Sequence, residues 1–259
     1  MNTHHPLIIE PIPAFKDNYI WALRRDTQLA IVDPGDAAPV FAYMQQRKLT
    51  LTAVLTTHHH ADHVGGVAQL LAQHPVPVFG PKNEPIQVLT HAVSEGDEVE
   101  IPQLAVRFRV IDVPGHTRAH IAYYGAGALF CGDTLFACGC GRLFEGTPAQ
   151  MRTSLTKLRD LPDDTLVYCA HEYTLSNISF ARMIDPNNAA LIERERRDTG
   201  LRAANRPTLP STLGEEKRTN PFLRWETPEI IQAAQQHLGA PAGSPDQVFA
   251  AIRDWKNRA

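Results

Sequence analysis

The sequence predicts an α/β domain at residues 1–173, followed by a smaller all-helical domain at residues 174–259. Short apolar segments of strand length alternate with helix-length segments through the first two-thirds of the chain. From about residue 174 the strand-like segments stop, and the chain becomes charged and helical in pattern. A chain of 259 residues is also long enough for one large domain and a smaller one.

The strands expected in the first domain are short apolar runs bounded by polar or turn residues. They lie at residues 7–12, 19–23, 29–32, 51–56, 77–79, 99–101, 106–113, 121–124, 129–131 and 165–169. Three helices are expected among them, at residues 37–48, 64–73 and 148–160. Asp36 can cap the first of these helices, and Thr147, Pro148 and Gln150 form a capping pattern for the third.

In the second domain we expect a charged helix at residues 189–204 and a connecting loop rich in Pro, Thr and Ser at residues 206–221. Two further helices begin with a capping residue and a proline, at Thr227-Pro228 and at Ser244-Pro245. The first domain has more acidic than basic side chains, whereas the second has more basic than acidic ones. The second domain is therefore the better candidate for binding an anionic group.

The composition is that of a soluble globular protein, with 43% hydrophobic residues, 20% charged residues and a net charge of −3. No apolar run approaches the roughly 20 residues that span a bilayer, and residues 1–12 lack the pattern of a signal peptide. The acidic balance argues against a nucleic-acid partner. Four cysteines are too few for a disulfide scaffold in a chain of this length, so we expect reduced thiols and a cytoplasmic protein.

Histidine is the unusual residue, with twelve in the chain. Four of them fall within residues 58–63, which suggests metal binding or proton chemistry. Five others are isolated and are interpreted as surface or loop residues: His4, His5, His74, His91 and His237. His120 is interpreted as part of the scaffold at the start of a strand.

The segment at residues 57–63 follows a buried strand directly and carries imidazole and carboxylate groups, which are ligands for zinc, iron or manganese. Alternate residues of an extended chain point the same way, so His58 and His60 can bind one metal ion while His59 points away. A turn at residue 61 would let Asp62 and His63 face a second metal ion.

Three further ligand candidates, His116, Asp133 and His171, each lie in a loop after a predicted strand. Strand-end loops are common places for chemistry. Each residue alone could be an ordinary capping or turn residue, but together they complete two three-ligand sets and a shared carboxylate. Asp33, also at a strand end, could orient one histidine or could simply be a turn residue.

The ligand pattern resembles the metallo-β-lactamase superfamily, which implies an αββα sandwich of two mixed sheets flanked by helices. Within that superfamily the chain resembles the glyoxalase II, or hydroxyacylglutathione hydrolase, family. Four parts of the chain carry this second resemblance: residues 131–136, 139–147, 171–174, and 210–217 together with 220–224. The last part lies in the helical domain, so the resemblance extends along the whole chain.

The resemblance implies that S-D-lactoylglutathione and water are converted to D-lactate and glutathione, the second step of methylglyoxal detoxification. It implies two divalent metal ions, which we expect to be zinc, with iron or manganese as alternatives. One ion would be bound by His58, His60 and His116, the other by Asp62, His63 and His171. Asp133 would bridge them and orient the attacking hydroxide.

The same resemblance implies a glutathione site formed by Arg142, Phe144, Tyr173, Arg253 and Lys256. Arg253 and Lys256 lie three apart and share a helix face, which suits a carboxylate, although they could also be solvated charges near a helix end. Phe144 replaces a tyrosine found in some members, so a phenol hydrogen bond is lost there. We expect a monomer with a small-molecule substrate and neither a nucleic-acid nor a membrane partner.

The sequence argues against four other functions. A β-lactamase of the same superfamily would carry a secretion signal and no helical domain. A persulfide dioxygenase would use one iron ion and lack the helical extension with its Arg/Lys pair. A metallo-nuclease is disfavoured by the acidic first domain, and a structural zinc module by the seven ligands, since structural zinc sites are closed and four-coordinate.

Overall fold

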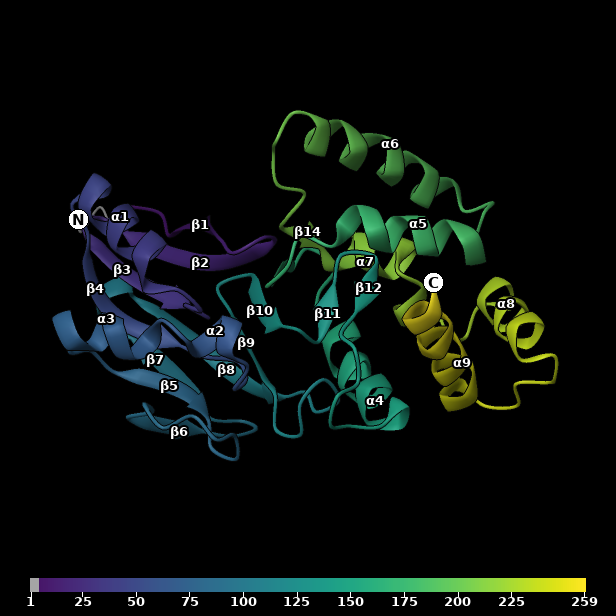
Figure 1. Cartoon of the computed structure of the whole chain (residues 1–259), viewed down its shortest axis with the longest axis horizontal. Helices are drawn as coiled ribbons and strands as arrows, with labels where there is room; N and C mark the ends of the chain where they lie inside the picture. Colours follow the sequence, from purple (N-terminus) through teal and green to yellow (C-terminus); the bar gives the residue numbers. More distant parts are fainter. Residues whose placement is uncertain (1–4) are drawn as a thin grey trace. The chain divides into compact units, whose positions relative to one another are not determined.

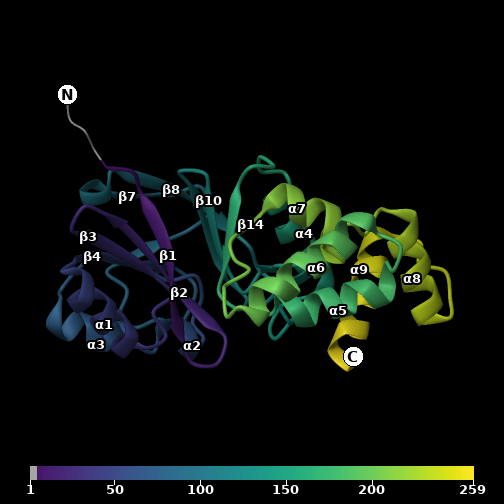
Figure 2. The same cartoon turned by 90° about the horizontal axis from the view of Figure 1, so that it is seen from above.

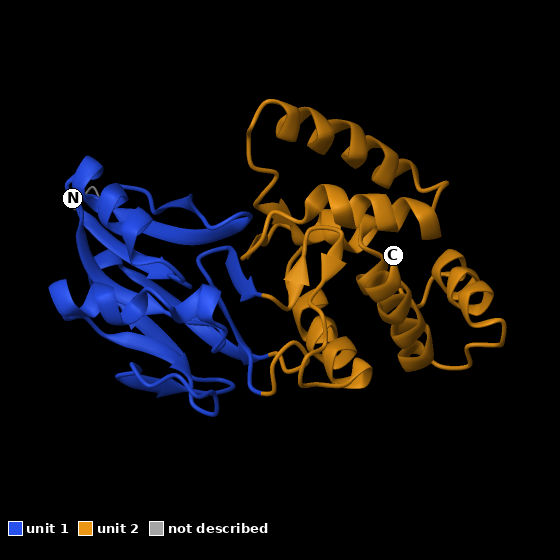
Figure 3. Cartoon of the chain, viewed as in Figure 1, with its two compact units in different colours: residues 1–112, 119–132 blue, residues 113–118, 133–259 orange. Residues whose placement is uncertain are grey.

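The structure, a computed structural model, describes residues 5–259, so the expectation for His4 lies outside the described residues. The chain divides into two compact units, Met1–Asp112 with Ala119–Gly132, and Val113–Arg118 with Asp133–Ala259 (Figure 3). These units are defined by how compactly their residues pack, and their limits differ from the expected domain boundary near residue 173. That boundary stays a prediction. The two units are described in turn.

The first sheet of unit 1 is mixed and has the strand order β1-β2-β3-β4-β5-β6. Its strands are β1 (Ile8–Ala14), β2 (Asn18–Arg25), β3 (Gln28–Val32), β4 (Thr50–Leu55), β5 (Val78–Pro81) and β6 (His91–Val93). The pairs from β1 to β3 are antiparallel and the pairs from β3 to β6 are parallel. Both faces of the sheet are covered, since Ile20 and Trp21 are neighbours in β2, point to opposite faces and are both buried.

Two helices of unit 1, α1 (Ala37–Arg47) and α3 (Val67–Gln73), cover one face of this sheet (Figure 1). Their buried side chains, including Val40 and Leu70, join Leu29 and Val54 of the sheet in one hydrophobic core. Asp36 caps α1 by accepting a hydrogen bond from the N–H of residue 38, as the sequence predicts. The histidine segment follows directly after the carboxyl end of β4.

Strands β7 (Glu98–Ile101), β8 (Val106–Asp112), β9 (Ile121–Gly125) and β10 (Ala128–Gly132) pair antiparallel in chain order, with the 3-10 turn η1 (Pro102–Leu104) after β7. Phe108 and Phe130 are fully buried and meet edge to face. The buried Tyr123 hydroxyl donates a hydrogen bond to the carbonyl oxygen of Thr56, 3.0 Å away, at the end of β4. This bond ties β9 to the start of the histidine segment.

Unit 2 holds short strands and most of the helices (Figure 2). Its elements are β11 (Leu135–Phe136), β12 (Gly139–Cys140), α4 (Pro148–Arg159), β13 (Leu166–Cys169), α5 (Thr174–Ile184), α6 (Ala189–Ala203), β14 (Ser211–Thr212), α7 (Leu213–Thr219), η2 (Pro221–Leu223), α8 (Pro228–Leu238) and α9 (Pro245–Arg258). Phe180, Phe222, Trp225 and Phe249 pack ring against ring inside the helical part. The helices from residue 174 onward confirm the expected helical region.

Some local expectations were wrong. The segment at residues 206–221, expected as a loop, contains β14 and α7. The expected helix at residues 64–73 is interrupted at Gly65 and Gly66, which separate the four-residue helix α2 (Ala61–Val64) from α3. The helix α5 and the hairpin of β11 and β12 were not expected. Within residues 5–259, no helix is long and apolar enough to cross a membrane.

Candidate metal centre

The histidine segment after β4 brings four of the expected ligands together within unit 1. The Nε2 atom of His58 lies 3.1 Å from Nδ1 of His60, and Nε2 of His63 lies 3.5 Å from Oδ2 of Asp62. The rings of His58 and His63 are 4.0 Å apart between centroids. His58 and His63 are buried, whereas His60 and Asp62 are half-buried at the edge of the cluster.

Asp33 orients two histidines of this cluster through hydrogen bonds. Its carboxylate accepts hydrogen bonds from the N–H and the hydroxyl of Thr57, both at 2.7 Å, and faces Nδ1 of His63 at 3.0 Å. Because a carboxylate only accepts, Nδ1 of His63 carries the proton and Nε2 keeps its lone pair. The Thr57 hydroxyl gives its proton to Asp33, so it accepts from Nδ1 of His58, 3.1 Å away. Asp33 thus prepares Nε2 of both histidines to bind a metal ion.

Asp33, His58 and His63 also place potential ligand atoms within 4.8 Å of one another. The oxygens of Asp33 already interact with Thr57 and His63, so Asp33 orients the expected ligands rather than acting as a ligand itself. This agrees with the first of the two interpretations of Asp33 given by the sequence. Gly35 allows the turn after Asp33 to pack against the ligand segment, because a Cβ atom at residue 35 would lie 1.9 Å from the carbonyl oxygen of Asp62. Only glycine lets the turn after Asp33 approach the ligand segment this closely.

Two residues that the sequence analysis missed hold the segment in place. Asn18, at the start of β2, donates a hydrogen bond from Nδ2 to Oδ2 of Asp62 over 3.0 Å. Glu84 is buried and accepts hydrogen bonds from the N–H of His59 at 3.2 Å and from the N–H of Ala119 at 3.0 Å. The Nδ1 atom of His59 also bonds to Glu84. Nδ1 of His59 therefore faces Glu84, while the His59 ring also lies 4.9 Å from that of His60 between centroids.

Replacing Glu84 with alanine is expected to weaken metal binding by about tenfold, the size of effect typical of groups that orient metal ligands. The reason is that His59 lies between two expected ligands and would lose the anchor that sets its backbone. Competition with a chromophoric chelator measures the affinity. Glu98→Ala is the matched control, because Glu98 is exposed on β7 and pairs with the exposed Arg107. Equal affinities for both variants would contradict this role for Glu84.

Unit 2 brings the other three expected ligands together. Oδ2 of Asp133 lies 3.3 Å from Nε2 of His116, and Oδ1 lies 3.3 Å from Nε2 of His171. Each oxygen of one carboxylate therefore faces a different histidine. Nδ1 of His116 lies 2.8 Å from the carbonyl oxygen of Arg142 and must carry its proton, because a carbonyl oxygen only accepts. Nε2 of His116 then directs a lone pair at the carboxylate.

The donor atoms of both sets fit a divalent metal ion. A lone pair that faces a carboxylate oxygen, as at His116 and Asp133, becomes favourable when a cation or a proton lies between the two atoms. Two ligand atoms of a tetrahedral zinc ion lie about 3.4 Å apart, and the four pairs described above lie 3.1, 3.5, 3.3 and 3.3 Å apart. The clustered histidines and aspartates therefore form a candidate metal site.

Two of the expected substrate residues lie against histidine ligands of unit 2. The ring of Tyr173 stacks on that of His171, with centroids 4.7 Å apart and planes 3° from parallel. The ring of Phe144 meets the edge of His116 with centroids 5.3 Å apart. Both aromatic residues are exposed, and Arg142 near them is exposed as well. Each ring therefore offers exposed aromatic surface beside one of the expected histidine ligands.

The expected cation pair lies on α9. Arg253 is buried, and its Nη1 donates a hydrogen bond to the carbonyl oxygen of Cys140, 2.8 Å away. Lys256 is half-buried, and its Nζ donates to the carbonyl oxygen of Ser176, 3.1 Å away, on α5. The two residues therefore differ, since Arg253 is committed to the protein interior whereas Lys256 is partly open to solvent.

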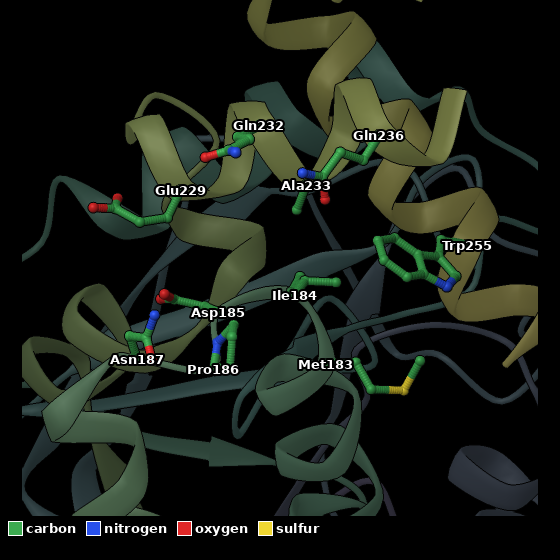
Figure 4. A pocket seen from close by; sticks show the side chains of 10 residues that line it. All are labelled: Met183, Ile184, Asp185, Pro186, Asn187, Glu229, Gln232, Ala233, Gln236 and Trp255. Carbon is green, nitrogen blue, oxygen red and sulfur yellow. The ribbon is translucent and has the colours of Figure 1, made fainter. Parts of the chain in front are cut away.

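A separate cavity of about 260 Å³ lies between the end of α5 and helix α8 (Figure 4). Asp185, Glu229, Gln232 and Trp255 are among its lining residues, and none of the expected site residues is. Asp185 at its edge is already paired with Arg224 and with the side-chain amide of Asn188. We therefore do not assign this cavity to the metal chemistry.

All four cysteines are buried and free of disulfides. Burial raises the pKa of the Cys138 and Cys169 thiols to about 12, and it also raises the pKa of Cys140. The protonated thiol is a poor nucleophile and a poor metal ligand. None of these three thiols is therefore suited to serve in the reaction.

Family models match almost the whole chain. A model described as the metallo-beta-lactamase superfamily matches residues 15–171, and one described as the hydroxyacylglutathione hydrolase C-terminus matches residues 172–259. A relative from Nitrosomonas eutropha named hydroxyacylglutathione hydrolase is 56% identical over 95% of this chain and 97% of its own. The first model confirms the fold class expected for the first domain, and the second confirms the helical region that follows it.

Two solved structures are also similar. The crystal structure of ETHE1 from Myxococcus xanthus is 28% identical with a TM-score of 0.66, covering 96% of this chain and 98% of that one. A structure of another protein in a di-iron-bound form is 25% identical with a TM-score of 0.59, covering 83% of this chain and 100% of that one. Both likenesses agree with the fold that the family models assign.

Proposed function

The chain belongs to the hydroxyacylglutathione hydrolase family of the metallo-beta-lactamase superfamily, and we propose that it performs this activity at a centre that combines both ligand sets. It is an enzyme, a metallohydrolase with hydroxyacylglutathione hydrolase activity. The substrate we propose is S-D-lactoylglutathione, which is cleaved by water to D-lactate and glutathione.

In the proposed centre the two sets supply seven ligands. His58, His60 and His116 bind one ion, Asp62, His63 and His171 bind the other, and Asp133 is shared. The observation that carries this proposal is the position of the Asp133 carboxylate, whose two oxygens lie 3.3 Å from His116 and from His171, respectively. A carboxylate between two histidines assigned to different ions is the arrangement that a bridging ligand requires.

Two divalent ions, when bound, would lower the pKa of a water molecule towards neutrality and polarise the thioester carbonyl. The protein's residues would supply the remaining requirements. Asp33 keeps His58 and His63 in the tautomer that leaves Nε2 free. The carbonyl of Arg142 does the same for His116. The leaving group is a thiol with an ordinary pKa of about 8.5, so it departs as a thiolate with little acid assistance.

The remaining residues would bind the glutathione part of the substrate. Tyr173 and Phe144 offer exposed aromatic surface beside the ligands. Arg142, Arg253 and Lys256 supply positive charge for the two carboxylates of glutathione. Because Phe144 has no hydroxyl, it contributes apolar contact only. In this proposal the residues of unit 2 bind the glutathione part, and the reacting thioester lies near the histidine ligands.

We propose zinc in both positions, with iron or manganese as alternatives, because imidazole and carboxylate suit all three metals. We further propose a monomeric, cytoplasmic protein. One chain supplies every proposed ligand and substrate residue, and the four free cysteines suit a reducing compartment. Elemental analysis identifies the metal, and light scattering measures the mass.

Incubation of the metal-loaded protein with S-D-lactoylglutathione tests the function. Free thiol should appear with the consumption of the thioester, and the protein's buried cysteines should add little background. A chelator should abolish the activity and zinc should restore it. A fully metal-loaded sample that releases no thiol would overturn the proposed function.

A further inference from the structure

The hairpin formed by β11 and β12 connects two parts of the proposed centre. It begins two residues after Asp133 and ends two residues before Arg142, whose carbonyl orients His116. Gly141 closes this segment, since its N–H donates to the carbonyl of Thr134 and a Cβ there would lie 1.9 Å from the carbonyl oxygen of Asp133. A shift of the hairpin would therefore displace Asp133 and loosen the support of His116.

Side chains from the helical region bind the backbone of this hairpin. Asn220 donates from Nδ2 to the carbonyl oxygens of Phe136 and Gly139, 3.0 and 2.9 Å away. Asn177 of α5 donates to the carbonyl of Ala137 at 3.0 Å. Arg253 of α9 donates to the carbonyl of Cys140, as described above. These bonds fix consecutive parts of the hairpin from several directions.

The turn of the hairpin has its own anchor. Cys138 adopts a left-handed backbone conformation with φ 55°, which is uncommon for a residue with a side chain. Its N–H donates to Oε2 of Glu216, 2.8 Å away. Glu216 is fully buried, and it also accepts from Asn220 at 3.1 Å. The carboxylate therefore joins the turn to the residue that binds both strands.

Glu216 is itself fixed by a buried arginine. Nη2 of Arg194 lies 2.6 Å from Oε1 of Glu216, and Nη1 donates to the Thr219 hydroxyl at 2.7 Å. Burial alone would lower the pKa of Arg194, but the charge of Glu216 raises it well above its ordinary value. Nε of Arg194 also lies 3.3 Å from Oδ2 of the buried Asp198, so Glu216 belongs to a buried network of charges. Breaking such a network is costly, which makes Glu216 a well-supported anchor.

We propose that Asn177, Glu216 and Asn220 are positioning residues for the metal centre, and that they act by fixing the β11–β12 hairpin between Asp133 and Arg142. We call these three residues the hairpin cradle. The inference rests on the proposed function for its link to turnover. It assigns the helical region a second task besides binding glutathione, since part of that region sets the geometry of a metal ligand.

The test compares Asn220→Asp and Asn177→Ala with Asn188→Ala. Aspartate at residue 220 keeps the shape but places an acceptor against two carbonyl oxygens, whereas Asn177→Ala removes a single hydrogen bond to the hairpin. Asn188 is the matched control, because it caps α6 and bonds to Asp185 and to the carbonyl of Arg218 on α7 rather than to the hairpin backbone.

For the two cradle variants we expect metal affinity and kcat each to fall by about tenfold, with KM little changed. The visible spectrum of the cobalt-substituted protein should shift, since it reports ligand geometry. Asn188→Ala should match the parent in affinity, kcat and spectrum. If Asn220→Asp does not fold, the milder variant Asn177→Ala tests whether the cradle positions the metal ligands.

Folded cradle variants with the parent's affinity and spectrum would overturn the inference, as would an equal loss in Asn188→Ala. Affinity and spectrum do not depend on the substrate. If the parent protein failed to hydrolyse S-D-lactoylglutathione, the proposed function would fall, while the affinities and spectra would still decide whether the cradle positions the metal ligands.

Discussion

Replacing Asp133 with asparagine is expected to lower kcat by at least about 100-fold, because changes to groups that only orient metal ligands already cost 10- to 100-fold. Asparagine keeps the shape of the side chain but loses the negative charge, and one of its two polar atoms becomes a donor. Since Oδ1 and Oδ2 face His171 and His116 separately, asparagine could serve only one side. The bound metal should fall below the parent's content.

The measurement pairs kcat with elemental analysis on the same sample, and circular dichroism confirms that the fold is kept. Asp36→Asn is the matched control, since Asp36 follows strand β3 and caps α1, and asparagine caps a helix as well as aspartate does. Its turnover should equal that of the parent. Near-normal turnover and full metal content in Asp133→Asn would exclude a bridging role.

The fold and the ligands could be predicted from the sequence where the signal is local. Short apolar runs bounded by polar residues marked strands such as β3 and β8, and a proline after a capping residue marked the starts of α4, α8 and α9. The histidine segment could be found because four potential ligands, three histidines and an aspartate, follow one buried strand within a few residues. Their assignment to two ions stays a prediction.

The supporting residues could not be predicted in this way. Glu84 lies 25 residues from His59, and Asn220 lies 84 residues from Phe136, so each becomes important only when the chain folds. Helix α5 has no side-chain cap at Tyr173, which removes the signal that marked helices such as α1, α4 and α9. Helix α7 did carry a signal, because Thr212 accepts a hydrogen bond from the N–H of Glu215, but its short length within a Pro-rich segment concealed it.

The second large effect concerns Lys256 and pH. Burial, together with the nearby charge of Arg253, lowers the pKa of Lys256 to about 8. The ammonium form, which would attract a substrate carboxylate, therefore predominates below pH 8 and is lost as the pH rises above it. We expect kcat/KM for S-D-lactoylglutathione to be constant near pH 7 and to fall above pH 8, mainly through KM, because the contact lies away from the reacting thioester.

Two variants separate this effect from titration of the substrate's own amine. Lys256→Arg keeps its charge across the range, so the fall above pH 8 should be reduced to whatever the substrate contributes. Lys256→Met should show a KM raised by about tenfold at pH 7, the cost expected for one hydrogen bond to a charged group, and should show the same reduced pH dependence. Arg253 is buried and donates to the carbonyl of Cys140, whereas Lys256 is half-buried and its ammonium group has donors besides the one to Ser176. The charge available to a carboxylate on this helix would therefore come chiefly from Lys256. An identical pH profile in all three proteins would show that Lys256 does not bind the substrate.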